Sequence, residues 1–263
     1  MVRRVEVAGL LMMVSIAACG RASGPPGSTI MLTVFAAASL RAVAAEAATA
    51  YRRVAGIDVQ VASDSSTALR VQIEQGAEAD LFLSADTKNP YALAAGGLVN
   101  GSVVAFARNG LAIITPGDDP AAIRSAADLA RPGVKIVAAG DEVPISVYAT
   151  KLIAELAADP AFGADFAAAY AANVVSHEDN VKAVVAKIEL GEGDAAIVYA
   201  SDAAASSVVR VIPLPAGINV LATYAGAVPA TARHPTEGHA LLDWLAGPAG
   251  QEILARFGFT PPS

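Results

Sequence analysis

Cysteine is almost absent from this 263-residue chain, in which Cys19 is the single example. One cysteine cannot form an intramolecular disulfide, so the fold must depend on its core. Charged residues make up 16% of the sequence and hydrophobic residues 54%, a balance that excludes an intrinsically disordered chain. The formal net charge is −7, which argues against nucleic acid or an anionic membrane surface as a partner.

The sequence also lacks the short motifs of several enzyme classes. It contains no G-x-S-x-G elbow, no H-E-x-x-H pair and no Walker-type glycine loop. His177 stands beside Glu178 and Asp179, but adjacent side chains do not converge on one point, and we interpret this stretch as a solvated helix start. His234 and His239 are expected on the surface. We therefore expect no enzymatic activity.

No apolar run in the chain is long enough to span a membrane comfortably; the longest, "VAGLLMMVSIAA", follows Arg3 and Arg4. It ends in "IAACG", which resembles a bacterial lipoprotein lipobox and implies cleavage before Cys19 and acylation of its sulfur. We expect residues 1–18 to be a signal peptide and 19–30 a Gly/Ser/Pro-rich tether, so that the domain is extracytoplasmic and reaches the cell membrane only through its lipid. An ordinary secreted protein with an incidental cysteine is the alternative.

From residue 31 onward, short apolar runs alternate with helical patterns. "MLTVFAA", "IDVQVAS" and "ADLFLSAD" are typical of buried strands, and amphipathic helical patterns follow each of them. Two helical patterns, "TEGHALLDWLAG" and "PAGQEILARFGF", end the chain. This alternation predicts an α/β fold with a parallel sheet.

Two extended runs indicate that the chain crosses between two lobes. The first, at 103–115, is long enough to pass from one lobe into another, and a return is expected near 213–224. The predicted first lobe contains residues 31–106 plus 217–263, and the second contains 107–216. Two such lobes are suited to capturing a ligand in the cleft between them.

In a parallel α/β sheet, ligands lie beyond the carboxyl ends of the strands, where helix N-termini offer free N–H groups to an anion. Small or serine residues occupy four such turns, although serine at any one of them is also an ordinary helix cap. These turns contain Ser39 in "FAAASL", Ser65 and Ser66 in "SDSSTALR", Pro144, Ile145 and Ser146 in "DEVPISVYA", and Asn180 and Val181 in "HEDNVKAVVAKI".

The phrases "TVFAAASL", "SSTALRVQIEQGAEADLFLSAD", "VPISVYA", "DNVKAVVAKIELGEGDAAIVYASDA" and "WLAGPAGQEILARFGF" occur in this order. Over roughly residues 31–260 the chain resembles the molybdate-binding proteins of bacterial ABC-type molybdate/tungstate importers. The resemblance implies a two-lobed, type II periplasmic-binding-protein-like fold with its ligand cleft between the lobes. It also implies capture of molybdate or tungstate and delivery to an ABC transporter permease.

The resemblance further implies which residues hold the oxyanion. Ser39 and Ser66 match the two first-lobe serines, Ile145 and Val181 match positions that use backbone amides, and Tyr199 matches a tyrosine that donates through its phenol. The family phrase has a small residue and glycine after its proline, whereas this chain has Ile145 and Ser146. Ser146 could therefore add a hydroxyl donor, and the Ile145 side chain could alter the shape of the cleft.

Neutral donors also account for the absence of lysine and arginine from these five positions. A site made of donors alone penalises any ligand that still carries a proton, which favours molybdate, tungstate or sulfate over phosphate. Carboxylates near these turns, at Asp80, Asp86 and Asp202, are expected to form structural hydrogen bonds.

Charge cannot separate molybdate from sulfate, so the preference for molybdate comes from the resemblance. We expect a monomer without cofactor or protein-bound metal. A sulfate receptor of the same architecture, a hydrolase using Ser39, and a structural surface lipoprotein remain alternatives.

Overall fold

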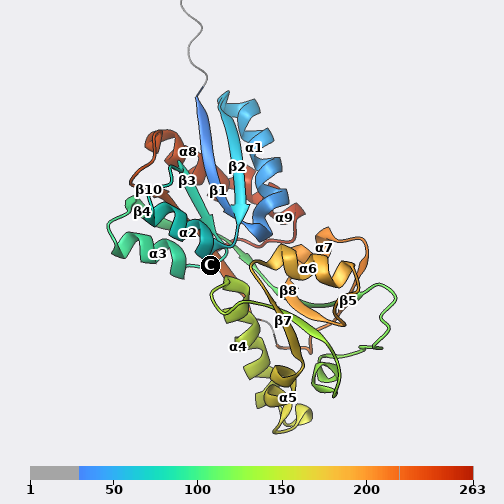
Figure 1. Ribbon diagram of the computed structural model, residues 1–263. Helices are drawn as coiled ribbons and strands as arrows, with labels where there is room; N and C mark the ends of the chain where they lie inside the picture. Colours follow the sequence, from blue (N-terminus) through green and yellow to red (C-terminus); the bar gives the residue numbers. More distant parts are fainter. Residues whose placement is uncertain (1–29, 219, 263) are drawn as a thin grey trace, which may run out of the picture.

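The computed structural model describes residues 30–218 and 220–262. The described residues form two lobes, one above the other in Figure 1, joined by extended segments. The expected signal peptide and tether, including Cys19, lie outside the described residues apart from Ile30. Across the described ranges, none of the helices combines the length and apolar character needed to cross a bilayer.

The first lobe is built on a five-stranded mixed sheet in the order β2-β1-β3-β10-β4. Its strands β1, β2 and β3 are parallel, whereas β10 runs antiparallel to both β3 and β4. The expectation of a parallel sheet is therefore wrong for β10 alone, which inserts between β3 and β4 when the chain returns from the second lobe, whereas β4 runs in the same direction as β1, β2 and β3. The strands are β1 (Met31–Ala37), β2 (Asp58–Asp64), β3 (Leu81–Ser84), β4 (Val99–Asn109) and β10 (Ala222–Pro229).

Helices cover both faces of this sheet because successive strand residues point to opposite sides. Val34 packs in the core cluster that contains residues of α1, α8 and α9, while its neighbour Phe35 packs with residues of α2 and α3. This alternation explains why β1 and β3 are buried on both faces, whereas the edge strand β2 exposes Gln60 and Ala62. The elements are the 3-10 helix η1 (Ala38–Leu40), α1 (Arg41–Ala55), α2 (Ser66–Glu74), α3 (Lys88–Ala95), α8 (Pro235–Ala246) and α9 (Pro248–Arg256).

The second lobe contains an antiparallel sheet, β8-β5-β9, beside a parallel pair, β6 and β7. The Val137 amide donates to the Ala195 carbonyl at 3.0 Å and links the two sheets. The strands are β5 (Leu111–Pro116), β6 (Ile136–Ala139), β7 (Val174–Glu178), β8 (Ala196–Tyr199) and β9 (Val209–Ile212). The helices are η2 (Ala126–Ala130), α4 (Pro144–Ala158), η3 (Pro160–Phe162), α5 (Phe166–Ala172), α6 (Val181–Glu189) and α7 (Ala200–Ala205).

The first extended run is divided at Gly110, with β4 in the first sheet and β5 in the second. β4 stays paired with β10 through Asn109, so the chain leaves the first sheet three residues after the expected position. His177 also differs from its expected place, because it lies in β7 and not at the start of a helix. The chain returns to the first lobe between β9, which ends at Ile212, and β10, which begins at Ala222.

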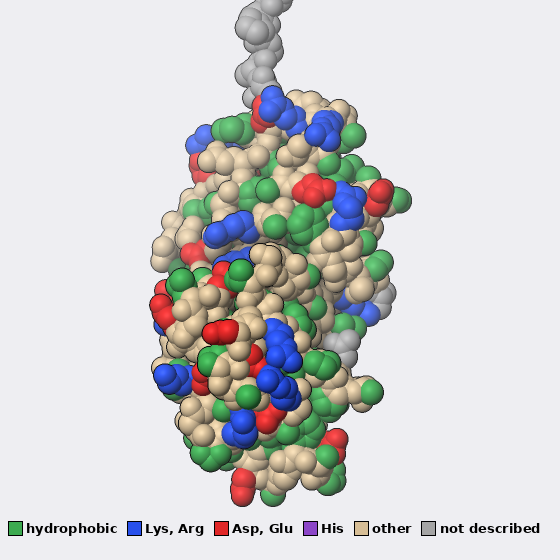
Figure 2. Space-filling model, turned by 90° about the vertical axis from the view of Figure 1, so that its right-hand side faces the viewer, with side chains coloured by type: hydrophobic (Ala, Val, Ile, Leu, Met, Phe, Trp, Pro, Cys, Tyr) green, Lys and Arg blue, Asp and Glu red, His purple; other side chains and the backbone are tan. Residues whose placement is uncertain are grey.

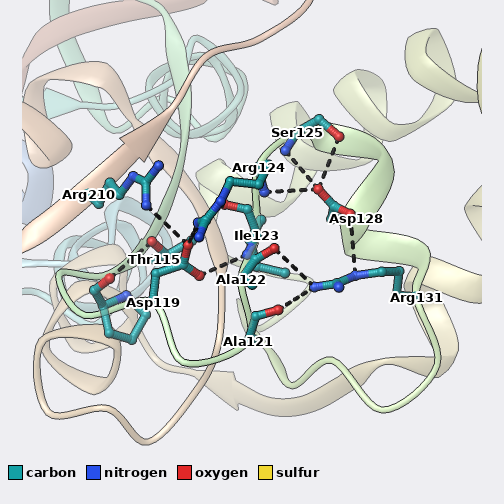
Figure 3. Close-up of polar contacts among 11 residues, drawn as sticks. Thr115, Asp119, Ala121, Ala122, Ile123, Arg124, Ser125, Asp128, Arg131 and Arg210 are labelled. Atoms are coloured by element: carbon teal, nitrogen blue, oxygen red, sulfur yellow. Dashed lines mark hydrogen bonds and ion pairs between the residues drawn. The ribbon is translucent and has the colours of Figure 1, made fainter.

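The loop that follows β5 is organised around the buried carboxylate of Asp119 (Figure 3). This carboxylate accepts a hydrogen bond from the Ile123 amide at 2.8 Å and forms ion pairs with Arg124 and Arg210. Asp119 has a φ of 43°, a left-handed conformation that Asp tolerates better than most residues. The loop lies beyond Pro116, at the opposite end of β5 from the strand's contact with Tyr199.

Candidate functional site

A small cavity lies where the two lobes meet. The starts of α2, α4 and α6, and the η1 turn before α1, all reach it. The structure thus brings together all five residues that the sequence singled out, from segments as much as 160 positions apart. The lining consists of Ser39, Ser66, Ile145, Val181 and Tyr199 with Ala37, Ala38, Ser65, Ala85, Val143 and Pro144.

Ser39 lies in η1, directly after β1, and is 6% exposed. Its Oγ is 2.9 Å from the Oη of Tyr224 in β10. Ala37 and Ala38 line the cavity beside it, and their small side chains allow a ligand to approach the backbone closely.

Ser66 and Ser65 have different tasks although they are adjacent. The Oγ of Ser65 accepts a hydrogen bond from the Ala68 amide at 3.2 Å and is the cap of α2. The Oγ of Ser66 accepts from the Ala85 amide at 3.0 Å, and Ser66 is 1% exposed. Because a hydroxyl has one hydrogen and this Oγ already serves as an acceptor, the hydrogen of Ser66 is free to point into the cavity.

Ile145 contributes a first-turn amide at the start of α4. Pro144 occupies the first helical position, where its missing N–H costs nothing, and Val143 provides no side-chain cap. The Ile145 N–H is among the first four amides of the helix, which have no acceptor within the helix. The Ser146 hydroxyl instead donates to the carbonyl oxygens of Ala139 at 2.9 Å and Gly140 at 2.8 Å, so it supplies no donor to this cavity.

Val181 is the first residue of α6, and Asn180 is its cap. The Oδ1 of Asn180 accepts from the amides of Lys182 at 3.0 Å and Ala183 at 3.1 Å. The cap therefore satisfies the second and third amides of the helix and leaves the Val181 N–H available to the cavity.

Tyr199 ends β8 and is 1% exposed. Its Oη is buried and has no hydrogen-bond partner among the described residues. A buried hydroxyl without a partner costs about 1–3 kcal/mol, so its position beside a cavity points to a missing acceptor. Burial raises the pKa of Tyr199 well above 10, which keeps the phenol a donor at neutral pH.

Every residue that lines the cavity is uncharged, and its donors are hydroxyls and helix-start amides. The helices α2, α4 and α6 begin at the cavity, and each adds the partial positive charge of its N-terminus. On the face shown in Figure 2, basic and acidic side chains are interspersed over both lobes, so this face carries no single-sign patch that would attract an anion. The arrangement can hold a small anion through fixed dipoles while excluding a cation.

The nearby carboxylates are held by other groups. Asp80 accepts from the amides of Thr33 and His234, each at 2.8 Å. Asp86 accepts from Ser84, and from the backbone and side chain of Asn89. Burial raises the pKa of Asp202 while the Lys182 ammonium, 2.7 Å from its carboxylate, opposes that shift. None of the three lines the cavity.

The geometry offers little for a hydrolase. Within residues 30–218 and 220–262, no group of three or more His, Cys, Asp or Glu side chains is placed to hold a metal ion. The cavity beside Ser39 has no histidine in its lining, and His177 lines a different cavity between α4, α5 and β7. His239 contacts Asn100 at 3.2 Å on the first lobe.

Two residues near the site were not predicted from the sequence. Tyr224 holds Ser39, and the Asn109 Nδ2 lies 3.4 Å from the same Tyr224 Oη. Both stand in strands that look like ordinary core strands, and 115 positions separate them in the chain. Only the pairing of β4 with β10 brings them together.

Comparison with known proteins gives consistent results. Residues 32–260 match the model of the family described as bacterial extracellular solute-binding protein. The molybdate-binding protein ModA of Mycobacterium tuberculosis is 33% identical over 264 residues, covering 100% of this chain and 97% of the relative.

Two solved structures share the fold. The periplasmic molybdate-binding protein of Azotobacter vinelandii superimposes with a TM-score of 0.74 at 20% identity, covering 88% of this chain and 100% of the other. The sulfate-binding protein SubI of M. tuberculosis superimposes with a TM-score of 0.75 at 19% identity, covering 88% and 87%.

Proposed function

Because the chain belongs to the bacterial extracellular solute-binding protein family, we propose that it captures molybdate, or tungstate, outside the cytoplasm and delivers it to an ABC importer. The observation that carries this proposal is the buried, unpartnered Tyr199 hydroxyl in a cavity lined only by neutral donors. Its acceptor would be an oxygen of the bound oxyanion. The relative named as molybdate-binding is similar over its full length, which supports this ligand over others of the same shape.

The five donors have distinct roles in the proposed complex. The hydroxyls of Ser39, Ser66 and Tyr199 and the amides of Ile145 and Val181 would each donate to an oxyanion oxygen. Because these donors are neutral groups held at helix starts and strand ends within each lobe, they would stabilise a dianion without the desolvation cost of a buried lysine or arginine. No cofactor and no direct protein ligand to molybdenum are needed.

Sulfate binding is the second candidate, and the fold shared with SubI favours it. Sulfate is a fully ionised dianion like molybdate, so the neutral donors suit both. The two differ in size, and the spacing of the donors must decide between them.

The mature protein is further proposed to be a monomer that binds the membrane only through an acylated Cys19. Its lobes would close on the ligand by bending at the two crossings, near Gly110 and within 213–221. The alternative of a hydrolase finds no support in the lining of the cavity.

Calorimetric titration of residues 30–263 with molybdate, tungstate, sulfate and phosphate tests the assignment. We expect one-to-one binding of molybdate and tungstate and no binding of phosphate. Ser39→Ala and Ser66→Ala should each weaken molybdate binding by about 1–3 kcal/mol, the usual loss for a donor to a charged group. Ser125→Ala, a serine on the far loop of the second lobe, is the matched control and should bind as the wild type does.

The possible outcomes separate the candidates. Binding of sulfate as tightly as molybdate would keep the site and change the substrate. Wild-type affinity in both serine variants would remove these residues from the site. Absence of binding to all four anions would overturn the proposed function.

A further inference from the structure

Four buried polar groups form a hydrogen-bonded chain that ends at Ser39. The Nδ2 of Asn109 is 2.7 Å from the Oγ of Ser201 and 3.4 Å from the Oη of Tyr224, and that Oη is 2.9 Å from the Oγ of Ser39. Asn109 and Tyr224 are each 0% exposed, while Ser39 and Ser201 are each 6% exposed. Tyr224 and Asn109 do not line the cavity, and Ser39 is the lining residue that their hydrogen bonds reach. The Tyr224 ring also packs against that of Tyr199, with centroids 5.5 Å apart, a contact that a phenylalanine at 224 would keep.

The direction of these hydrogen bonds follows from one backbone amide. The Ser201 N–H faces the Oδ1 of Asn109 at 3.4 Å, and a backbone amide can only donate. The carboxamide is thereby oriented with its oxygen toward Ser201 N and its NH₂ group toward the two hydroxyls. Asn109 donates to Tyr224, so the phenol hydrogen of Tyr224 is left for the Oγ of Ser39.

The last hydrogen bond of the chain ends at Ser39, which lines the cavity. Ser39 accepts from Tyr224, and its own single hydrogen then points away from Tyr224 and toward the cavity that Ser39 lines. Burial raises the pKa of Tyr224 well above 10 and outweighs the opposing hydrogen bonds from Ser39 and Asn109, so the phenol keeps its proton.

We propose that Tyr224, oriented by Asn109, is a positioning residue that fixes Ser39 as a hydrogen-bond donor and so makes the site reject protonated oxyanions. This inference rests on the proposed oxyanion-binding function and adds a source of its selectivity. A free serine hydroxyl can rotate and accept a hydrogen bond from the hydroxyl of a protonated ligand such as hydrogen arsenate. With Tyr224 in place, the Ser39 Oγ accepts the phenol hydrogen of Tyr224, and the hydrogen of Ser39 itself points to the ligand.

The test is Tyr224→Phe, assayed by titration with molybdate and with arsenate in mildly alkaline buffer, where arsenate keeps one proton. Arsenate is chosen because it is tetrahedral and closer in size to molybdate than phosphate is. We expect molybdate affinity to fall about tenfold, and the preference for molybdate over arsenate to fall by a similar factor or more. Tyr51→Phe, a buried tyrosine that packs against Trp244 away from the cavity, should leave both values unchanged.

A double-mutant measurement separates an effect of Tyr224 through the Ser39 hydroxyl from an effect of Tyr224 on packing. In a Ser39→Ala background, Tyr224→Phe should have no further effect on either anion, because the group through which Tyr224 acts is gone. If Tyr224→Phe does not fold, Asn109→Leu should shift the preference in the same direction by removing the group that orients the phenol.

The outcomes distinguish this inference from the proposed function. Tight molybdate binding by the wild type, with an unchanged preference in Tyr224→Phe, would overturn the role of Tyr224 alone. An equal loss of affinity in the presence and absence of the Ser39 hydroxyl would also overturn it. Failure of the wild type to bind any oxyanion would overturn the proposed function and this inference together.

Discussion

At the scale of single residues, the Tyr199 hydroxyl is the most informative group in the molecule. It is a donor for which residues 30–218 and 220–262 offer no acceptor. Such a group lowers stability in the absence of ligand and raises affinity in its presence. The same atom therefore has opposite effects on folding and on binding.

Tyr199→Phe should separate these two effects. We expect the free energy of unfolding of the free protein to stay unchanged or rise by up to about 1 kcal/mol, because a buried unsatisfied hydroxyl is removed. Molybdate affinity should fall by about 1.5–3 kcal/mol, the range for a hydrogen bond to a charged group. Urea unfolding without ligand and calorimetry with molybdate measure the two quantities. A destabilised free protein with normal affinity would show that the hydroxyl has a partner within the fold.

The five residues predicted through the resemblance all line one cavity, because each belongs to a short phrase at a strand-to-helix turn. The neighbours that orient them could not be predicted in this way. Tyr224 and Asn109 lie in the middle or end of strands, and no local pattern tells a core tyrosine from one that holds a serine. Position in the sequence can also mislead. Ser146 follows Ile145 and was expected as a possible donor to the ligand, but its hydroxyl donates to the carbonyl oxygens of Ala139 and Gly140.

At the scale of elements, the start of α6 combines a helix cap with a contact between the lobes. The Asn180 Oδ1 caps the helix, while its Nδ2 lies 3.4 Å from the Asp64 carboxylate of the first lobe. Capping contributes to stability whether or not a ligand is bound, whereas the contact with Asp64 exists only when the lobes are together.

Asn180→Ala and Asn180→Ser should separate the contribution of the helix cap to stability from the contribution of the Asp64 contact to ligand affinity. Serine retains a cap, so only the alanine variant should lose about 1 kcal/mol of unfolding free energy. Both variants lose the amide that reaches Asp64, and both should show the same small decrease in molybdate affinity. Urea unfolding and calorimetry on the two variants check this. Equal stabilities in the two variants would mean that the cap contributes little to the fold.

Two elements of the second lobe could not be predicted from periodicity. β7 shows no clear apolar alternation in the sequence, because none of its residues is fully buried and Val175 is 58% exposed. α7 was missed because it spans six residues directly after β8, too few for a helical pattern. The division of the long run at Gly110 depends on which partner strands each half meets, and this is a tertiary property.

At the scale of the whole molecule, contacts between the lobes surround the cavity. The Thr67 hydroxyl donates to the Glu142 carbonyl at 2.6 Å, and the rings of Tyr199 and Tyr224 lie 5.5 Å apart across the lobes. These groups come from segments on both sides of each crossing. Their convergence means that ligand contacts and lobe contacts form together, so binding and closure are thermodynamically coupled.

Four tyrosines, three of them buried and Tyr170 partly buried, allow a prediction of how the stability of the fold responds to alkaline pH. Burial raises the pKa of Tyr148 and Tyr170 to about 12 and that of Tyr199 and Tyr224 well above 10. For a group whose pKa is raised on folding, the stabilisation is complete below its pKa in the unfolded chain, near 10, and is lost as pH rises toward the folded value. Above about pH 10 each such tyrosine should therefore lower the free energy of unfolding by about 1.4 kcal/mol per pH unit.

We expect tyrosinate absorbance from these residues to appear in one step, together with the loss of helical circular dichroism. Tyr170→Phe, in a residue far from the oxyanion cavity, should flatten the dependence of stability on pH without changing molybdate affinity. Bound molybdate should move the transition to higher pH, since a ligand that binds only the folded state stabilises it by mass action. Gradual ionisation of these tyrosines with the fold intact would contradict this account, because buried phenolates would then be tolerated beside the anion site.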